Sequence, residues 1–374
     1  MNRFVIEHAK VADRAELLDL LLKAFRENNP DHPPFDILYP ELLAATDAAM
    51  RLHLIIRENG RITACVGVYP LDLRIGPVQV RVAGIGQVVC APEARRGGRV
   101  SALLKHAVGY MAATLKCPLS WLGGRREFYA MFGWERAGSI VQLNLDGRSV
   151  GTPPEGWRVS QAAITPETAD QLWELRNRQP VRQILTRQEW FTKLQRHGTE
   201  IWCATPDGSS QPTTFVVLNA SGKQLCEWTG IDTGIHAIVA TLVKQYQGVS
   251  LQLLPGFDPG TEFFWTHSVW TSGVMSNLLV ADLPALLAAY APLIEERLPP
   301  GKGLDLNMTA WQSLDSATAR LGAGGENLSL DPLRMARFLF GPAAPSAMLQ
   351  LPAHQRWLDQ VFPLPFRLPL NSHL

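Results

Sequence analysis

A strand-like run that ends in a basic, glycine-containing turn and continues straight into a helix-like segment constrains this 374-residue sequence most. The run Val78–Cys90 is apolar, Pro92 ends it, and Arg95–Arg99 (RRGGR) forms the turn. In Val100–Thr114 apolar residues recur every three or four positions, which predicts a helix. The unpaired N–H groups at the start of such a helix converge with the positive charge of the turn. The stretch therefore predicts a pyrophosphate-binding site.

Two other phosphate-binding patterns are excluded. The chain contains no GxxxxGK[ST] segment, and Gly84-Ile85-Gly86 is followed by Val89 where a dinucleotide fingerprint requires glycine. Charge excludes another class, because 35 Lys and Arg residues balance 34 Asp and Glu residues. Such a chain has no overall field that attracts a polyanion, so we expect no nucleic-acid partner.

Composition also limits the compartment and the cofactors. The five cysteines lie far apart without a CxxC pair, which predicts free thiols and a cytoplasmic location. The most apolar run, Leu283–Ile294, is far shorter than the roughly 20 residues that cross a bilayer, so we expect no membrane partner. The spacing of the histidines fits no set of metal ligands, so we expect no metal.

The pattern along the chain predicts an α+β protein with three domains. Strand-like runs at Leu52–Arg57 and Ile62–Ile75 precede Val78–Cys90 closely enough to form an antiparallel meander. The loop-rich stretch Gly151–Gly156 marks a boundary, and a second mixed α/β unit follows it. A proline-rich tail, residues 350–374, is typical of an extended segment pinned to a surface. The predicted domains are residues 1–148, 149–262 and 263–374.

Two motifs resemble the GNAT acetyltransferase superfamily. Arg95-x-x-Gly98-x-Val100 resembles its acyl-CoA-binding motif, which is Arg or Gln, two residues, Gly, one residue, then Gly or Ala; Val100 departs from the last position. Glu127–Trp134 (EFYAMFGW) resembles its FYxxFGF segment, and the motifs and predicted elements follow the family's order. The resemblance implies a mixed sheet flanked by helices, with acetyl-CoA as co-substrate.

The resemblance also implies roles for individual residues. The strand positions that offer backbone N–H groups to the thioester and pantetheine are Val88, Val89 and Cys90. The positions that wrap the pyrophosphate are Arg95, Arg96, Gly97, Gly98, Arg99, Val100 and Ser101. Tyr129 looks like the tyrosine that protonates the departing CoA thiolate, which a phenol with a pKa of about 10 can do. The implied activity is that of an N-acetyltransferase (EC 2.3.1 class) in which a primary amine attacks the thioester directly in a ternary complex.

The later part of the chain resembles one family in particular. Asp282–Leu298, Gly303–Met308 and Leu328–Pro342 resemble the sterol-carrier-like domain of the enhanced intracellular survival (Eis) acetyltransferases. There a catalytic GNAT domain precedes a second, degenerate GNAT-like domain and the carrier-like domain, and bulky residues are common at the position of Val100. The resemblance implies a homo-oligomer, a trimer or hexamer, and a C-terminal carboxylate, here that of Leu374, as general base.

Several alternatives remain open at this stage. His373 competes with Leu374 as the base, and water is a third possibility. A non-catalytic acyl-CoA sensor needs the basic turn but not Tyr129, and a carrier of hydrophobic ligands needs only the third domain. The resemblance implies an acceptor that is an amine-bearing small molecule or peptide. The loop Asp31–Asp36 lies between the first helix and the first strand, where members of the superfamily often build the acceptor pocket. Asp31, Asp36 and Glu41 would attract a cationic amine, although a plain surface loop explains them at least as well.

Overall fold

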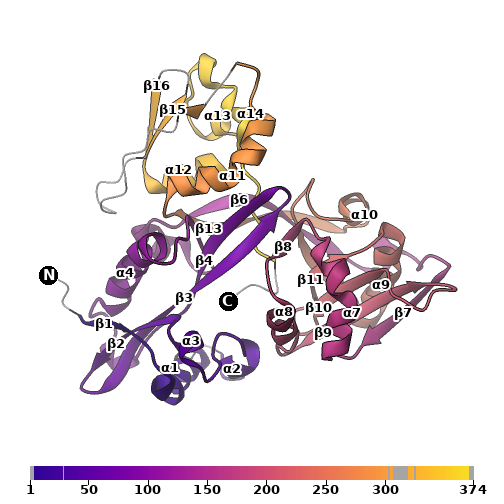
Figure 1. The fold of residues 1–374 in the computed structure, drawn as a ribbon, viewed down its shortest axis with the longest axis horizontal. Helices are drawn as coiled ribbons and strands as arrows, with labels where there is room; N and C mark the ends of the chain where they lie inside the picture. The colour runs from indigo at the N-terminus through magenta and orange to yellow at the C-terminus, as the bar shows by residue number, and fades with distance from the viewer. Residues whose placement is uncertain (1–3, 28, 302–303, 306–318, 324–325, 370–374) are drawn as a thin grey trace.

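A computed structural model describes residues 4–27, 29–301, 304–305, 319–323 and 326–369. Within these ranges thirteen strands form one continuous mixed sheet, and three more form a small second sheet. Figure 1 shows the first part of the chain, the second part and the C-terminal part as three lobes around the large sheet. No helix in the described ranges is long and apolar enough to cross a membrane.

The first part of the chain contains the meander and its flanking helices. Its strands are β1 (Ile6–His8), β2 (His53–Glu58), β3 (Arg61–Ile75), β4 (Val78–Cys90), β5 (Leu119–Leu122) and β6 (Glu135–Leu145). Its helices and helical turns are η1 (Val11–Asp13), α1 (Arg14–Arg26), α2 (Phe35–Leu38), α3 (Asp47–Met50), η2 (Pro92–Ala94), α4 (Arg99–Ala113), α5 (Arg126–Tyr129) and η3 (Ala130–Phe132). The antiparallel pairing of β2, β3 and β4 confirms the predicted meander.

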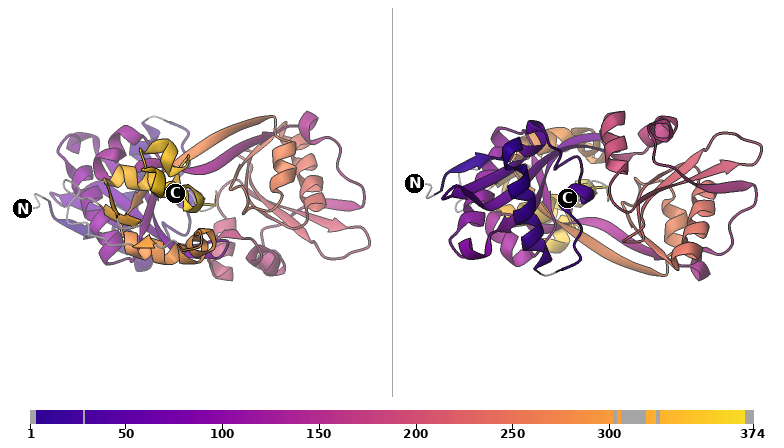
Figure 2. Two further views of the ribbon diagram at one scale, coloured as in Figure 1. Left: turned by 90° about the horizontal axis from the view of Figure 1, so that it is seen from above. Right: turned by 90° about the horizontal axis from the view of Figure 1, so that it is seen from below.

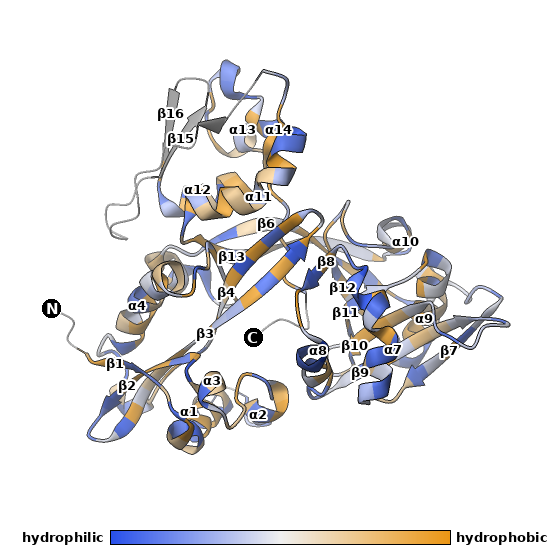
Figure 3. Ribbon diagram, in the orientation of Figure 1, coloured by the Kyte–Doolittle hydropathy of each residue, from blue (hydrophilic) through white to orange (hydrophobic). Residues whose placement is uncertain are grey.

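Alternation along the strands gives this sheet two apolar faces. Val66 and Ile85 pack with α4 on one face, whereas Cys65 and Val89 pack with α1 on the other. Toward the turn that joins β3 to β4, buried and exposed residues alternate, which Figure 3 shows as alternating colours along both strands. The α1 and α4 helices therefore lie on opposite sides of the strand that leads into the basic turn.

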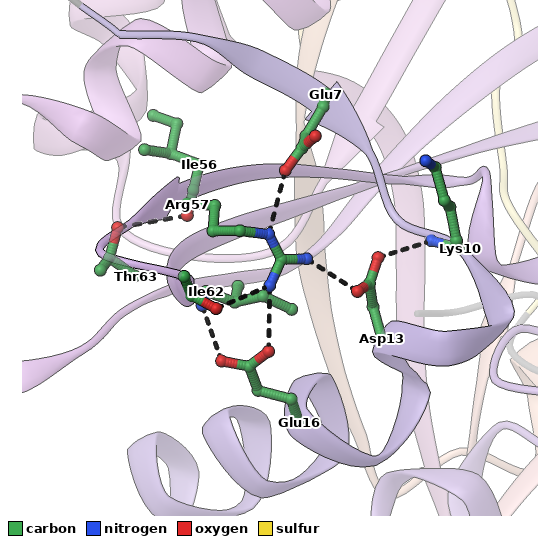
Figure 4. A network of polar contacts seen from close by, with 9 residues as sticks. Glu7, Lys10, Asp13, Glu16, Ile56, Arg57, Ile62 and Thr63 are labelled. Carbon is green, nitrogen blue, oxygen red and sulfur yellow. Dashed lines mark hydrogen bonds and ion pairs between the residues drawn. The ribbon is translucent and has the colours of Figure 1, made fainter.

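Arg57 of β2 fastens α1 and the N-terminal strand to the sheet (Figure 4). Its guanidinium donates to Glu7 of β1 over 3.2 Å, to Asp13 over 2.7 Å and to Glu16 over 3.2 Å. Glu16 also accepts the backbone N–H of Ile62 in β3 over 2.8 Å. Because one cation serves three elements at once, the position of α1 is fixed relative to β2 and β3.

The second part of the chain has a sheet covered by helices on both faces. Its elements are α6 (Gly147–Val150), β7 (Trp157–Ala162), α7 (Pro166–Asn177), β8 (Val181–Gln183), α8 (Arg187–Leu194), β9 (Thr199–Pro206), β10 (Thr214–Asn219), β11 (Gln224–Thr229), α9 (Asp232–Tyr246), β12 (Val249–Leu253) and α10 (Thr261–Thr266). One face packs on α9 and the other on α7 and α8. The short β8 leaves this part and pairs with β3 of the first part.

The C-terminal part completes the large sheet. Its elements are β13 (Trp270–Val280), α11 (Leu283–Arg297), β14 (Leu304–Asp305), β15 (Ala319–Ala323), β16 (Glu326–Leu330), α12 (Pro332–Phe340), α13 (Pro345–Met348), η4 (Ala353–Gln355) and α14 (Leu358–Val361). The β13 strand lies between β5 and β6 and pairs antiparallel with both. Figure 2 shows β6 and β13 running together between the two main bodies of the molecule. The sequence analysis did not predict this strand.

The segment after α14 is buried rather than laid on the outside. Phe362, Leu364 and Phe366 join the core formed by α11, α12 and the far end of β3 and β4. The Tyr290 hydroxyl of α11 donates to the carbonyl of Pro365 over 2.8 Å. Arg367, 3% exposed, pairs with Asp258 in the loop between β12 and α10. The tail is therefore pinned between the C-terminal and second parts as far as residue 369.

Removing the buried cation should destabilise the fold. In Arg367→Leu, Asp258 keeps a buried carboxylate without its partner, so we expect the free energy of unfolding to fall by about 3–5 kcal/mol. Urea titration followed by tryptophan fluorescence measures this change. The matched control is Arg334→Leu, because Arg334 pairs with Asp331 on the surface and such pairs contribute below about 1 kcal/mol. Equal effects of the two substitutions would contradict the prediction.

Candidate active site

The parallel strands β4 and β5 separate at the centre of the sheet. They pair from Val82 and Leu119 to Ile85 and Leu122, where β5 ends. The β4 strand continues to Cys90 with only β3 beside it. Backbone groups along one edge of its last residues therefore have no neighbouring strand, which leaves an opening where an extended ligand can bind by strand-like hydrogen bonds.

A bulge in β4 accompanies this separation. Between its pairs with Gly67 and Cys65 of β3, the β4 strand contains one residue more than its neighbour, and Gln87 has a positive φ of 46°. The Tyr69 hydroxyl donates to the side-chain carbonyl of Gln87 and lies 2.9 Å from Nε2 of His53. All three side chains are buried. This network holds the bulge in place from beneath the sheet.

The basic turn after β4 ends at a helix start that no side chain caps. Arg96 and Gly98 have positive φ values of 62° and 84°, which turn the chain sharply into α4. The helices α7, α11 and α12 each begin with a Thr or Asp side chain that accepts an N–H group, but α4 has no such cap and no acidic residue in its first turn. Its first N–H groups are therefore available to an anion.

The three arginines of the turn differ in their partners. Arg95 pairs with Glu27 at the end of α1, and Arg99 makes two hydrogen bonds of 2.8 and 2.9 Å to Glu58. Within the part of the chain that the structure describes, Arg96 makes no ion pair. Among the described residues of the turn, Arg95 and Arg99 are therefore paired with carboxylates, and Arg96 is not.

A cavity of about 530 Å³ joins the open edge of β4 to the turn and to α5. Its lining includes most of the predicted site residues: Val88, Cys90, Arg95, Arg96, Gly98, Arg99, Val100, Ser101 and Tyr129. Burial raises the pKa of the Tyr129 phenol above its ordinary value of 10, so this group is protonated at neutral pH. The cavity thus combines an anion site, an open strand edge and a proton donor.

The loop and helix that carry Tyr129 are held by the C-terminal part. The amide of Asn277 in β13 donates to the carbonyl of Gly124 over 3.1 Å. Glu135, 1% exposed, accepts hydrogen bonds from Arg126 of α5 and from Arg337 of α12, the latter over 3.1 Å. Two elements beyond residue 263, β13 and α12, therefore hold the loop and helix that carry Tyr129.

A second cavity of about 600 Å³ adjoins the first at the end of β4. Val88, Cys90 and Arg95 line both cavities, and Val89 lines only the second. The opposite wall consists of residues from α1 and from the loop that follows it: Ala24, Phe25, Glu27, Asn29 and His32. The two cavities therefore share part of their lining at the last residues of β4 and the turn that follows it.

The other residues predicted from the sequence either lie outside the described residues or are absent from the lining of these two cavities. Leu374 and His373 lie outside the described residues. Of the acidic residues expected near an amine, Asp36 is 3.1 Å from Arg14 and Glu41 pairs with Arg196 of the second part, so their charges are already balanced. The loop Asp31–Asp36, where the family resemblance places the acceptor pocket, contributes His32 to the wall of the second cavity. The other residues of that wall, Ala24, Phe25, Glu27 and Asn29, were not predicted from the sequence.

One family model matches the first part of the chain. Residues 5–137 are similar to the family described as an acetyltransferase (GNAT) domain. No curated protein matches the sequence. The match covers the meander, the turn, α4 and Tyr129.

Solved structures share the fold over nearly the whole length. A GCN5-related N-acetyltransferase from Kribbella flavida is 18% identical, with a TM-score of 0.68 over 96% of this chain and 95% of that one. Eis1 from Mycobacterium abscessus is 15% identical, with a TM-score of 0.67 over 99% and 100%. A GCN5-related N-acetyltransferase from Anabaena variabilis is 14% identical, with a TM-score of 0.66 over 96% of each chain. At these identities the likeness shows the fold alone.

The network beneath the bulge should make stability depend on pH. Burial lowers the pKa of His53 to about 4, whereas an unfolded histidine titrates near 6.5. The unfolded state therefore binds more protons between these values, and the free energy of unfolding falls by about 3 kcal/mol as the pH drops from 7 to 4. His53→Gln keeps a side-chain N–H for Tyr69 but cannot titrate. Urea unfolding at several pH values should show a shallower pH slope for this variant, and identical slopes would refute the role of His53.

Proposed function

We propose that this protein is an N-acetyltransferase that moves the acetyl group of acetyl-CoA to a primary amine. The observation that carries the proposal is the meeting of two cavities at the end of β4, one of which joins an open strand edge to an uncapped helix start. The first cavity suits the donor and the second suits the acceptor. The acetyltransferase domain match at residues 5–137 supports the same reaction class.

The donor is bound by backbone groups for the most part. The N–H groups at the start of α4 and the guanidinium of Arg96 hold the pyrophosphate, together with the remaining residues of the turn from Arg95 to Ser101. The exposed edge of Val88, Val89 and Cys90 pairs with the pantetheine arm as an added strand would. This arrangement directs the thioester to the point where the cavities meet.

The chemical step is a direct transfer in a ternary complex. The amine nitrogen forms a bond to the thioester carbonyl carbon, and a strand amide near Val89 stabilises the oxyanion that develops. The carbon–sulfur bond then breaks, and the Tyr129 hydroxyl gives its proton to the leaving thiolate. The amine must lose a proton to a base in the same cycle, because an alkylammonium is not a nucleophile.

Finer features of the proposal come from the family resemblance. The resemblance makes the carboxylate of Leu374 a candidate base, with His373 and water as alternatives, and the tail that carries these two residues is buried as far as residue 369. Domain limits at 1–148, 149–262 and 263–374, a second GNAT-like domain, a sterol-carrier-like third domain, a cytoplasmic location and a trimeric or hexameric assembly stay predictions. The β13 strand bears on the domain limits, because it comes from residues beyond 263 and yet lies between β5 and β6 of the first part.

Donor binding should depend on the turn. We expect calorimetry to give micromolar binding of acetyl-CoA to the wild type and no measurable binding to Arg96→Ala/Gly98→Glu, which removes the unpaired cation and places a carboxylate at the helix start. The matched control is Arg158→Ala/Gly156→Glu, because Gly156 also has a positive φ, 82°, and its Cβ would meet open space. The control should bind normally. Absence of binding to the wild type would refute the proposed function.

Turnover should depend on the phenol of Tyr129. We expect Tyr129→Phe to lower kcat by about 100-fold or more while the affinity for acetyl-CoA is unchanged, since only proton donation to the thiolate is lost. Release of CoA, followed with a thiol reagent, measures kcat. The control is Tyr110→Phe on α4, outside both cavities. Normal biological function of Tyr129→Phe would favour a sensor over an enzyme.

A further inference from the structure

His32 lies on the wall of the acceptor cavity, opposite the residues at the end of β4. Its ring stacks on Phe35, with centroids 4.8 Å apart and planes 24° apart, and lies 5.4 Å from the ring of Phe25. Phe35 is buried, so the surface beneath the imidazole is fixed. Although His32 follows α1 in a proline-rich loop, its ring is therefore held in one orientation.

A hydrogen bond determines which ring nitrogen can accept a proton. Nδ1 of His32 is 2.7 Å from the carbonyl oxygen of Pro33. A carbonyl oxygen only accepts, so Nδ1 carries the hydrogen and Nε2 carries the lone pair of the neutral ring. The same kind of second contact orients imidazoles that act as bases or ligands in other proteins.

The other titratable side chains of this cavity are poor bases. Arg95 donates to Glu27 and thereby lowers the pKa of the Glu27 carboxyl. Burial raises the pKa of the Cys90 thiol, which keeps it protonated. Arg95 itself is a cation without an acceptor. Among the described residues that line the cavity, the imidazole is the remaining proton acceptor.

We propose that His32 is the general base that removes the proton from the acceptor amine. This inference rests on the proposed function and gives a chemical role to one residue of the loop where the family resemblance places the acceptor pocket. The bound alkylammonium first gives one proton to Nε2, which passes it to solvent, and the free amine nitrogen then bonds to the carbonyl carbon. As the carbon–sulfur bond breaks, the nitrogen gives its second proton to Nε2, and Tyr129 gives its proton to the departing sulfur. Solvent restores the proton of Tyr129 and takes the one left on Nε2, so no further reactant is needed.

Charged groups around His32 come from three elements. Arg26, at the end of α1, donates to the backbone carbonyl of His32 over 3.1 Å. Glu27 and Arg95 face the ring from the same cavity and pair with each other. Asp31 precedes His32 in the loop, and Asp36 of α2 pairs with Arg14. Of the three carboxylates, Glu27 and Asp36 are therefore each paired with an arginine.

The test is His32→Asn, whose side-chain amide can still donate to Pro33 but has nothing in place of Nε2. With spermidine as acceptor we expect kcat to fall by about 100-fold or more, the KM for acetyl-CoA to stay unchanged, and the acidic limb of the kcat/KM profile to disappear. With hydroxylamine, whose conjugate acid has a pKa of about 6, the loss should shrink to below about tenfold, because the nucleophile is already neutral at pH 7.5. The control is His106→Asn on α4, which lines neither cavity.

The outcomes separate this inference from the proposed function. A wild type that neither binds acetyl-CoA nor releases CoA would overturn both. A wild type that turns over, with an equally active His32→Asn, would overturn only the role of His32. Equal losses with spermidine and hydroxylamine would mean that His32 merely shapes the cavity, which also overturns it. A chain extended by one glycine after Leu374 moves the terminal carboxylate; loss of activity there, with normal His32→Asn, would identify the tail as the base.

Discussion

The separation of β4 from β5 is the constraint on which the rest of the site depends. Two parallel strands that stop pairing in the middle of a sheet leave backbone donors and acceptors without partners, and a folded protein tolerates this only where a ligand or solvent takes their place. The bulge at Gln87 turns β4 away, and the Tyr69 contact beneath it keeps that turn fixed. Both cavities and the uncapped start of α4 follow from this local departure from regular pairing.

Much of the first part could be predicted because its signals are local. The meander, the turn and α4 follow from alternation, from Pro92 and from apolar residues at helical spacing, and the structure confirms each of them. Arg96 and Tyr129, one from each of the two motifs, line the same cavity. These features depend on neighbours in sequence, so a single chain carries enough information to find them.

Features that depend on distant contacts were out of reach. No periodicity in Trp270–Val280 indicates that this strand lies between β5 and β6, because its partners precede it by more than a hundred residues. Asn277 is a buried amide in this strand, and its contact with the carbonyl of Gly124 exists only in the folded chain. Similarly, the sequence places His32 in the loop expected to build the acceptor pocket, but its stacking on Phe35 and its position opposite the end of β4 appear only in the structure. In both cases the role follows from contacts with residues that are distant in sequence.

The position of β13 has a consequence for how the protein is made. During synthesis the ribosome releases the whole of residues 5–137 long before Val280 emerges, so the nascent first domain presents β5 with a bare edge on the side where β13 later pairs. An unpaired strand edge can pair with other strands. The strand that covers this edge, β13, is synthesised only after the whole second part of the chain. The order of translation thus makes β13, which lies between β5 and β6, the last of the described strands to join the large sheet.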